Sequence, residues 1–274
     1  MLDVSDVMLT GRRALVTGAG QGIGEGIALG LASFGADVAV LDINEQTAER
    51  TAARVRELGH ESTAICVDVR ASASLESALE QASEELGGLD IIVNNAGTAT
   101  HKPAIQFDDS EFDEQIALNL KPSFVAARWA AKRWIAAGSG GSIVNVATTE
   151  GIRGCPGFAP YSAAKAGMIN LTKTLSSELG PYGIRVNAIA PDYTPTPGLG
   201  HIDLEGQTPE EMMSGMTRFI PLRRLGTPDD MAGAVIFLCS GLASWVSGQT
   251  LVIDGGALPC ARVEGPLPFP SLRP

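Results

Sequence analysis

The sequence predicts an α/β fold built on one parallel sheet, and three observations predict it. Short apolar segments suited to buried strands alternate with segments whose apolar residues recur at helical spacing. A glycine-rich turn joins the first of these strands to the first helix, and polar residues follow the ends of several strands. Ligands of parallel sheets bind at the carboxyl ends of the strands, so we expect the functional site at that edge. The length of 274 residues suits one large domain.

The composition excludes several classes of protein. The chain carries 20 Lys and Arg against 31 Asp and Glu, which argues against nucleic acid or an anionic membrane as partner, because phosphate binding needs clustered cations. No apolar run is long enough to span a bilayer, and the first 15 residues lack the features of a signal peptide. The 4 cysteines and 3 histidines show no metal-ligand spacing. We therefore predict a soluble, cytoplasmic protein without a metal site.

The first expected strand, at 13–17, leads into a turn that reads T-G-x-x-x-G-x-G, and an apolar helical pattern follows. Glycines let the backbone turn tightly and approach a pyrophosphate, which can rest on the free N–H groups of the helix N-terminus. A turn that only connects strand to helix is the alternative. The expected cofactor contacts here are Gly18, Gln21, Gly22, Ile23 and Gly24.

The second expected strand, at 37–41, ends in Asp42. An acidic side chain at this point can accept hydrogen bonds from the adenosine ribose hydroxyls, and it repels a 2′-phosphate. No Lys or Arg lies within 41–44 to receive that phosphate, which favours NAD(H) over NADP(H). In the alternative interpretation, Asp42 is the N-cap of the helix expected at 45–58.

The third and fourth expected strands, at 62–67 and 89–93, also end in polar segments. These ends should lie beside the glycine turn at the carboxyl edge of the sheet. Asn94 fits two roles equally well, a cofactor contact or a side chain that ties neighbouring strands together. The further expected cofactor contacts are Asp68, Val69, Asn95, Ala96 and Gly97.

The candidate chemistry lies in the second half of the chain. Tyr161 and Lys165 form a Y-x-x-x-K pair at the start of an expected helix, and that spacing places both side chains on one helix face. A tyrosine titrates near ~10, so it needs a nearby positive charge to exchange protons at neutral pH, and Lys165 can supply it. The expected strand at 142–147 ends at Thr148, thirteen residues before Tyr161.

Together these motifs resemble the short-chain dehydrogenase/reductase family. The resemblance rests on T-G-x-x-x-G-x-G, N-N-A-G, a hydroxyl residue thirteen positions before the tyrosine, and Y-x-x-x-K. It extends from about residue 11 to 256. The resemblance implies a doubly wound, seven-stranded parallel sheet with helices on both faces, in a single domain at 1–258. It also implies a homotetramer or homodimer.

The resemblance assigns roles at matching positions. Tyr161 is the general acid/base, Lys165 lowers its pKa and holds the nicotinamide ribose, and Asn119 steadies a water-linked proton relay. Thr148 stands where the family has a serine that holds the substrate oxygen; it keeps the hydroxyl, but its methyl group narrows the pocket. Thr149 could present its hydroxyl instead, and we favour Thr148.

The segment after the expected strand at 184–190 departs from the family pattern, because Asp192 replaces a glycine after Pro191. The resemblance places Pro191, Thr194 and Thr196 near the nicotinamide carboxamide, with Thr196 at the better spacing. We interpret Asp192 as a solvated loop residue rather than a substrate contact.

Residues 193–226 are expected to form a methionine-rich lid over an apolar substrate, with packing against the main domain as the alternative. Residues 259–274 contain five prolines and read as an irregular C-terminal tail. The expected substrate-pocket residues are Thr149, Cys155, Phe158, Met212, Met213 and Met216.

The sequence thus predicts an NAD(H)-dependent oxidoreductase that interconverts a secondary alcohol and a ketone by hydride transfer, on an apolar small molecule. One alternative is a 3-oxoacyl-thioester reductase, whose carrier would need a basic patch such as Arg218, Arg223 and Arg224. A second alternative is a nucleotide-binding protein without catalytic activity.

Overall fold

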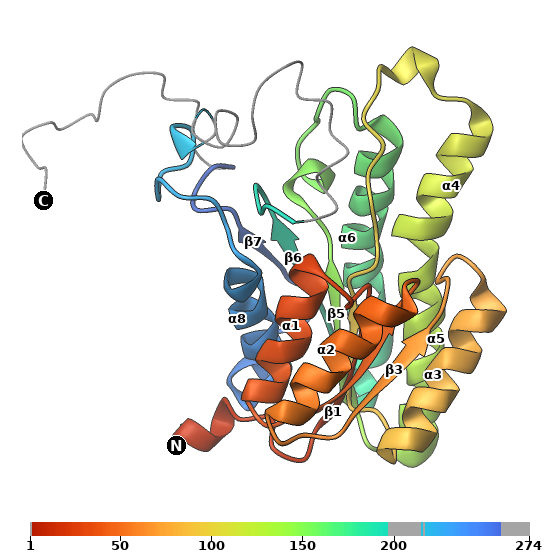
Figure 1. The fold of residues 1–274 in the computed structure, drawn as a ribbon, viewed down its shortest axis with the longest axis vertical. Helices are drawn as coiled ribbons and strands as arrows, with labels where there is room; N and C mark the ends of the chain where they lie inside the picture. Colours follow the sequence, from red (N-terminus) through yellow and green to blue (C-terminus); the bar gives the residue numbers. More distant parts are fainter. Residues whose placement is uncertain (1, 197–214, 216, 259–274) are drawn as a thin grey trace, which may run out of the picture.

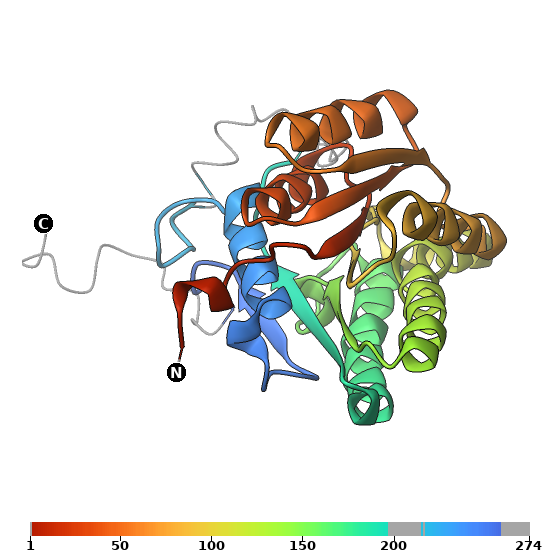
Figure 2. The same cartoon turned by 90° about the horizontal axis from the view of Figure 1, so that it is seen from below.

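The structure is a computed structural model that describes residues 2–196, 215 and 217–258. They form a seven-stranded parallel sheet in the order β3-β2-β1-β4-β5-β6-β7. Figures 1 and 2 show helices on both faces of this sheet. The chain runs outward from β1 to β3, crosses back to β4 and continues to β7, which is the doubly wound arrangement. The predicted fold class is confirmed.

For the six strands and the one helix whose bounds the sequence predicts, the observed bounds lie within two residues of those expected. The strands are β1 Arg13–Thr17, β2 Asp37–Asp42, β3 Ser62–Cys66, β4 Ile91–Asn94, β5 Gly141–Val146, β6 Ile184–Pro191 and β7 Thr250–Ile253. The α-helices are α1 Gly22–Ser33, α2 Glu45–Glu57, α3 Ser72–Leu86, α4 Asp109–Asn119, α5 Lys121–Ala137, α6 Ala159–Leu179 and α8 Pro228–Cys239.

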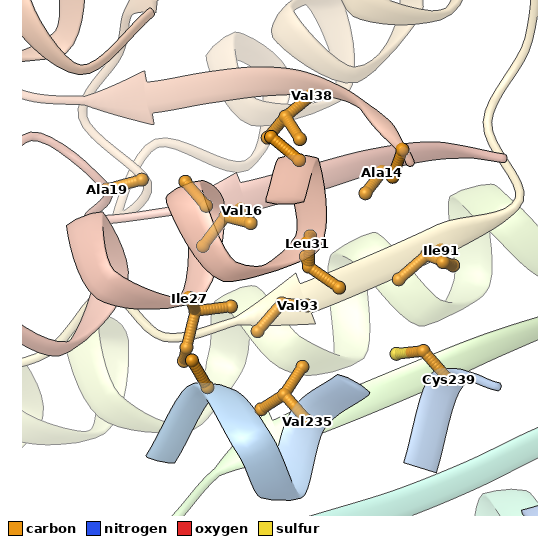
Figure 3. Packing of buried hydrophobic residues seen from close by; sticks show 14 of the residues in the cluster. Ala14, Val16, Ala19, Ile27, Leu31, Val38, Ile91, Val93, Val235 and Cys239 are labelled. Atoms are coloured by element: carbon orange, nitrogen blue, oxygen red, sulfur yellow. The ribbon is translucent and has the colours of Figure 1, made fainter. Parts of the chain in front are cut away.

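Apolar side chains pack on both faces of the sheet. Along β1, Val16 belongs to the core formed with α1 and α8, whereas its neighbour Leu15 belongs to the core formed with α3 and α5. Figure 3 shows the first of these cores, where Ile27 and Leu31 of α1 and Val235 of α8 pack over β1 and β4. Successive strand residues point to opposite faces, so a strand buried on both sides needs apolar residues throughout.

A buried polar chain ties β4 and β5 to α6. Asn94 Nδ2 donates to Asn145 Oδ1 at 2.9 Å, and Asn145 Nδ2 donates to Thr172 Oγ1 at 2.9 Å. All three side chains are buried. Of the two roles open to Asn94, the structure therefore supports the tie between neighbouring strands.

Replacing Asn145 with alanine should destabilise the fold by about 2–3 kcal/mol, because two buried polar groups would lose a partner at once. Denaturant unfolding monitored by circular dichroism measures this. Asn170→Ala, at an exposed position of α6, is the control and should change the unfolding free energy by less than about 0.5 kcal/mol. Equal unfolding midpoints for the two variants would show that the hydrogen bonds of Asn145 contribute no stability.

Parts of two predicted segments lie outside the described residues. Of the expected lid at 193–226, residues 197–214 and 216 are not described, and neither is the expected tail at 259–274. Within the described part of the chain, no helix combines the length and apolar character needed to cross a bilayer. The same described residues contain no group of three or more His, Cys, Asp or Glu that could hold a metal ion.

Candidate active site

The glycine turn after β1 packs against the end of β4. Gly18 has a φ of +61°, and a Cβ there would lie 2.8 Å from Ala96 Cα. A Cβ on Gly24 would lie 2.1 Å from the carbonyl oxygen of Gly18. Asn95 fixes the packing, since its Nδ2 donates to the carbonyls of Thr17 and Gly18 at 2.9 and 3.0 Å. Among the described residues, no side chain caps the start of α1, so its first N–H groups are available to an anionic ligand.

Asp42 ends β2 beside this turn. Its Oδ2 accepts a hydrogen bond from the Gly20 N–H at 2.8 Å, and its Oδ1 accepts one from the Asn44 N–H at 3.0 Å. The interpretation of Asp42 as a helix cap is wrong, because the N-cap of α2 is Asn44, whose side chain accepts from the Thr47 N–H. The carboxylate instead lies against the glycine turn.

Arg50 also reaches the glycine turn, and sequence reasoning missed it. Its Nη2 donates to the Gly20 carbonyl at 2.9 Å and lies 3.8 Å from a carboxylate oxygen of Glu25. The search for a cation covered only 41–44, whereas Arg50 comes from the second turn of α2. The signal that could have identified Arg50 is its position in the second turn of the helix that follows Asp42.

Lys165 is buried at the end of β5. Its Nζ donates to the Val146 carbonyl at 2.7 Å, and burial lowers the pKa of the ammonium to about 8. A Cβ on Gly97 would lie 3.4 Å from Lys165 Nζ and 2.5 Å from Asn119 Oδ1. The end of β4 therefore meets both side chains, and only a glycine leaves room for them.

Asn119 is placed by the break between α4 and α5. Its Nδ2 donates to the Thr98 carbonyl at 3.0 Å and to Gln115 Oε1 at 3.0 Å. Its Oδ1 is buried and accepts no hydrogen bond from any described residue. A buried acceptor of this kind is costly unless a ligand or water satisfies it.

Tyr161 lies in the first turn of α6, and its ring centroid is 5.8 Å from Lys165 Nζ. Burial and the nearby Glu150 carboxylate raise the pKa of the phenol, while a hydrogen bond with Thr148 acts in the opposite sense. The lowering expected from Lys165 is not seen in this structure. That role stays a prediction.

Glu150 belongs to a charged group that sequence reasoning missed. The Thr148 hydroxyl donates to one Glu150 carboxylate oxygen. Arg153 Nη2 lies 3.6 Å from the other, and 3.0 Å from Asp192 Oδ2. The Asp192 side chain is 3% exposed, so the interpretation of Asp192 as a solvated residue is wrong. Burial raises the pKa of this carboxyl, and Arg153 opposes that rise.

Several predicted residues lie close to this group. The Pro191 carbonyl is 3.3 Å from Thr148 Oγ1, and the Phe158 ring centroid is 6.3 Å from that of Tyr161. Thr148 and Thr149 are both buried and both donate to Glu150, but it is Thr148 that also shares a hydrogen bond with Tyr161. This geometry supports the choice of Thr148 over Thr149.

Other predicted residues have partners of their own. Asp68 accepts hydrogen bonds from Arg70, the shortest at 2.7 Å, and the Thr194 hydroxyl donates to the Asp192 carbonyl at 2.8 Å. Cys155 is half-buried, and burial raises the pKa of its thiol. Three predicted pocket residues lie outside the described residues: Met212, Met213 and Met216.

The residues present fit a dinucleotide laid across the carboxyl edge of the sheet. The glycine turn, the start of α1 and Asp42 lie on the side of β1 and β2. Lys165 and Asn119 Oδ1, which has no partner among the residues described, lie beyond the end of β4, against Gly97. Between them is the point where the strand order reverses, which is where open α/β sheets bind such ligands.

Comparisons with known proteins agree with this geometry. A family model described as enoyl-(acyl carrier protein) reductase matches residues 18–257. A short-chain dehydrogenase/reductase of Armillaria gallica is 39% identical over 249 residues, which are 90% of this chain and 95% of the relative.

Two solved structures have the same fold over almost the whole chain. A 7α-hydroxysteroid dehydrogenase complexed with NADH and 7-oxo glycochenodeoxycholic acid has a TM-score of 0.87 and 35% identity, covering 93% of this chain and 98% of that one. A gluconate 5-dehydrogenase from Burkholderia cenocepacia, in complex with NADP and tartrate, has a TM-score of 0.86 and 34% identity, covering 94% and 99%. The chain belongs to the short-chain dehydrogenase/reductase family, whose members are oxidoreductases that act on hydroxyl and keto groups.

Proposed function

We propose that this protein interconverts a secondary alcohol and a ketone with NAD(H), using Tyr161 as the general acid/base. One observation carries the proposal. The Tyr161 phenol, the Thr148 hydroxyl and the Lys165 ammonium meet at the carboxyl edge of the sheet, beside a buried Asn119 oxygen that accepts no hydrogen bond within the described part of the chain. This is an arrangement for moving one proton to or from a substrate oxygen.

The protein's residues divide the work as follows. In oxidation, Tyr161 in its phenolate form takes the hydroxyl proton of the substrate, and Thr148 holds the substrate oxygen. Lys165 places a positive charge near the phenol. The amide oxygen of Asn119 would accept a hydrogen bond in the water-linked proton relay. In reduction the same groups return the proton. The bound nicotinamide supplies the hydride acceptor or donor.

The cofactor would be held by the elements that converge on the switch point. The glycine turn and the start of α1 would take the pyrophosphate. Asp42 would accept from the adenosine ribose hydroxyls, and Lys165 would hold the nicotinamide ribose. Asn95 acts on the turn rather than on the ligand, because its amide is committed to the turn's carbonyls.

The preference for NAD(H) is part of this proposal. One solved relative holds NADH and another holds NADP, so the choice depends on this chain's own residues. The Asp42 carboxylate would repel a 2′-phosphate.

Asp42→Ser should therefore shift the ratio of kcat/KM for NADP over NAD upward by about tenfold or more. Removing the carboxylate ends the repulsion and leaves Arg50 at the turn to meet the phosphate. Steady-state kinetics with both cofactors measures the ratio. Glu45→Ser, an equal charge change at an exposed position of α2, is the control. An unchanged ratio in Asp42→Ser would remove Asp42 from cofactor selection.

The substrate's character follows less directly. The prediction of an apolar substrate depended on Met212, Met213 and Met216, which lie outside the described residues, so it remains a prediction. The Glu150 carboxylate beside Thr148, with Arg153 next to it, favours a polar substrate instead. The cytoplasmic location and the tetrameric or dimeric state also remain predictions.

A 3-oxoacyl-thioester reductase is the second candidate, because the description of the matching family model names an acyl carrier protein as the carrier of the substrate, although the reaction it names is reduction of an enoyl double bond. The basic patch that an acidic carrier would need is partly occupied, because Arg224 pairs with Asp230 at 2.6 Å. Arg223 donates to the Arg218 carbonyl. A nucleotide-binding protein without activity would have no use for a phenol and a hydroxyl placed together, as Tyr161 and Thr148 are.

Turnover of purified protein with NAD or NADP tests the proposed function, using a panel of secondary alcohols, their ketones and a 3-oxoacyl thioester. Turnover of an alcohol and ketone pair supports it. Turnover of the thioester alone would favour the second candidate. Silence across the panel, with cofactor binding still detected by calorimetry, would contradict both.

A further inference from the structure

A compact charged group lies directly beside the candidate catalytic hydroxyl. Glu150 follows β5 in the short 3-10 helix Thr149–Gly151, and Asp192 follows the end of β6. Arg153 lies between their carboxylates. Neither the acid/base role of Tyr161 nor cofactor binding uses these three residues.

The geometry puts the Glu150 carboxylate within reach of a bound substrate. One of its oxygens accepts the Thr148 proton, so a substrate oxygen held by Thr148 would lie next to that carboxylate. The carboxylate also acts on the Tyr161 phenol, whose pKa it raises. The Glu150 side chain is 18% exposed, so part of it is accessible to a ligand.

The carboxylate has capacity for a further hydrogen bond. An ionised carboxylate offers about four acceptor positions. Thr148 takes one, the Thr149 hydroxyl lies at 3.4 Å, at the long end of hydrogen-bond range, and Arg153 at 3.6 Å forms an ion pair beyond that range. Asp192 holds Arg153 from the other side at 3.0 Å, and its own side chain is almost fully buried. Arg153 and Asp192 are thus positioning residues for Glu150.

The charge of the Glu150 carboxylate favours some classes of substrate over others. The Glu150 carboxylate lies next to the hydroxyl of Thr148, so it would repel an anionic group placed beside the substrate oxygen that Thr148 holds. Covering the Glu150 carboxylate with an apolar substrate would remove its hydration without a compensating partner, which is costly. A neutral substrate with a hydroxyl donor beside its reacting carbon avoids both penalties and gains a charge-assisted hydrogen bond.

We propose that Glu150 determines specificity by accepting a hydrogen bond from a second hydroxyl of a neutral, polyhydroxylated substrate, next to the carbinol held by Thr148. This inference rests on the proposed function, since it uses the same Thr148 and Tyr161. It replaces the apolar substrate class with a neutral polyol and its ketone.

The test compares three NAD-linked substrates of matched chain length: a neutral polyol, a secondary alcohol with a single hydroxyl, and the sugar acid of the polyol. For the parent protein, we expect kcat/KM on the polyol to exceed that on each of the others by about tenfold or more. In Glu150→Gln, the ratio of polyol to monohydric alcohol should fall by about tenfold, chiefly through KM. The sugar acid should gain relative to the polyol. Glu49→Gln, at a surface ion pair with Arg56, is the matched control and should leave both ratios unchanged.

A binding measurement separates recognition from turnover. On a Tyr161→Phe background with NAD present, calorimetry should show polyol binding about tenfold weaker when Glu150 is glutamine. If Glu150→Gln does not fold, as judged by thermal unfolding, Glu150→Asp takes its place. That variant keeps the charge but shortens the reach, and it should lose part of the polyol preference.

Two outcomes would overturn the inference. In the first, the parent protein oxidises the monohydric alcohol as well as the polyol. In the second, Glu150→Gln slows all three substrates by the same factor, which is what a purely structural role predicts. In both cases the proposed function still stands if Tyr161→Phe abolishes turnover. Full turnover by Tyr161→Phe would instead refute the proposed function, and the inference with it.

Discussion

Replacing Tyr161 with phenylalanine should lower kcat for alcohol oxidation by about 10²–10⁴-fold, the usual contribution of a positioned general acid/base. The change removes only the phenolic oxygen and keeps the ring near Phe158. We therefore expect NAD(H) affinity, measured by calorimetry, to change little. Steady-state kinetics with reduced nicotinamide as the readout gives kcat.

Tyr182→Phe is the matched control for this prediction. Tyr182 is 52% exposed and lies at the far end of α6, in the turn Gly180–Tyr182. Its loss of a hydroxyl should leave kcat unchanged. A Tyr161→Phe protein with the same kcat as this control would exclude Tyr161 as the proton carrier.

Replacing Lys165 with methionine should abolish most activity while making the fold more stable. Activity should fall by at least about a hundredfold, since the phenol loses its neighbouring charge. Lys165 is 3% exposed, and burial lowers its pKa from 10.5 to about 8. This corresponds to about 3 kcal/mol that opposes the buried ammonium. Losing the hydrogen bond to the Val146 carbonyl costs about 1 kcal/mol of stability. We therefore expect the free energy of unfolding of Lys165→Met to exceed that of the parent by about 1–2 kcal/mol at neutral pH.

The stability gain should depend on pH in a defined direction. The folded state has the lower pKa, so between pH 8 and 10.5 the unfolded chain binds the proton more tightly. The parent protein therefore becomes more stable, as far as Lys165 is concerned, as pH rises through this range, whereas below it the penalty is fully present. The advantage of Lys165→Met should accordingly be largest at neutral pH and shrink toward pH 10.5.

Lys173→Met, at an exposed position of the same helix, is the control for the stability measurement. Thermal or denaturant unfolding at neutral pH and near the upper end of the range compares the three proteins. A Lys165→Met protein that is less stable than its parent at neutral pH would show that the ammonium is fully compensated in the folded state.

The fold could be predicted because its signals are local. The strand β1 has apolar residues at every position from Ala14 to Val16, as a strand buried on both faces requires. The glycine turn could also be predicted, since the positions of Gly18 and Gly24 have no room for a side chain. The polar ends of β2, β4 and β5 then place Asp42 and Thr148 at one edge of the sheet.

The charged group around Glu150 could not be predicted, because it depends on tertiary contacts. Arg153 and Asp192 are 39 positions apart and meet only when the end of β6 packs beside the 3-10 helix after β5. Asp192 looks like a loop residue in sequence, yet its side chain is almost fully buried. Arg50 reaches the glycine turn in a similar way, from a different element.

The protonation of the catalytic pair also depends on burial. The spacing of Tyr161 and Lys165 predicts a phenol made more acidic by an ammonium. In the structure, burial raises the pKa of Tyr161 and lowers that of Lys165. Spacing alone reports that two groups are near each other, whereas desolvation depends on everything packed around them.

The most direct test of the central claim is the formation of reduced nicotinamide by the parent protein and by Tyr161→Phe, assayed side by side with NAD and a panel of secondary alcohols. We predict turnover of at least one alcohol by the parent, greatest for a neutral polyol, and a loss of at least about a hundredfold in Tyr161→Phe while cofactor binding persists. Equal turnover by the two proteins would contradict the assignment of Tyr161 as the acid/base of this oxidoreductase.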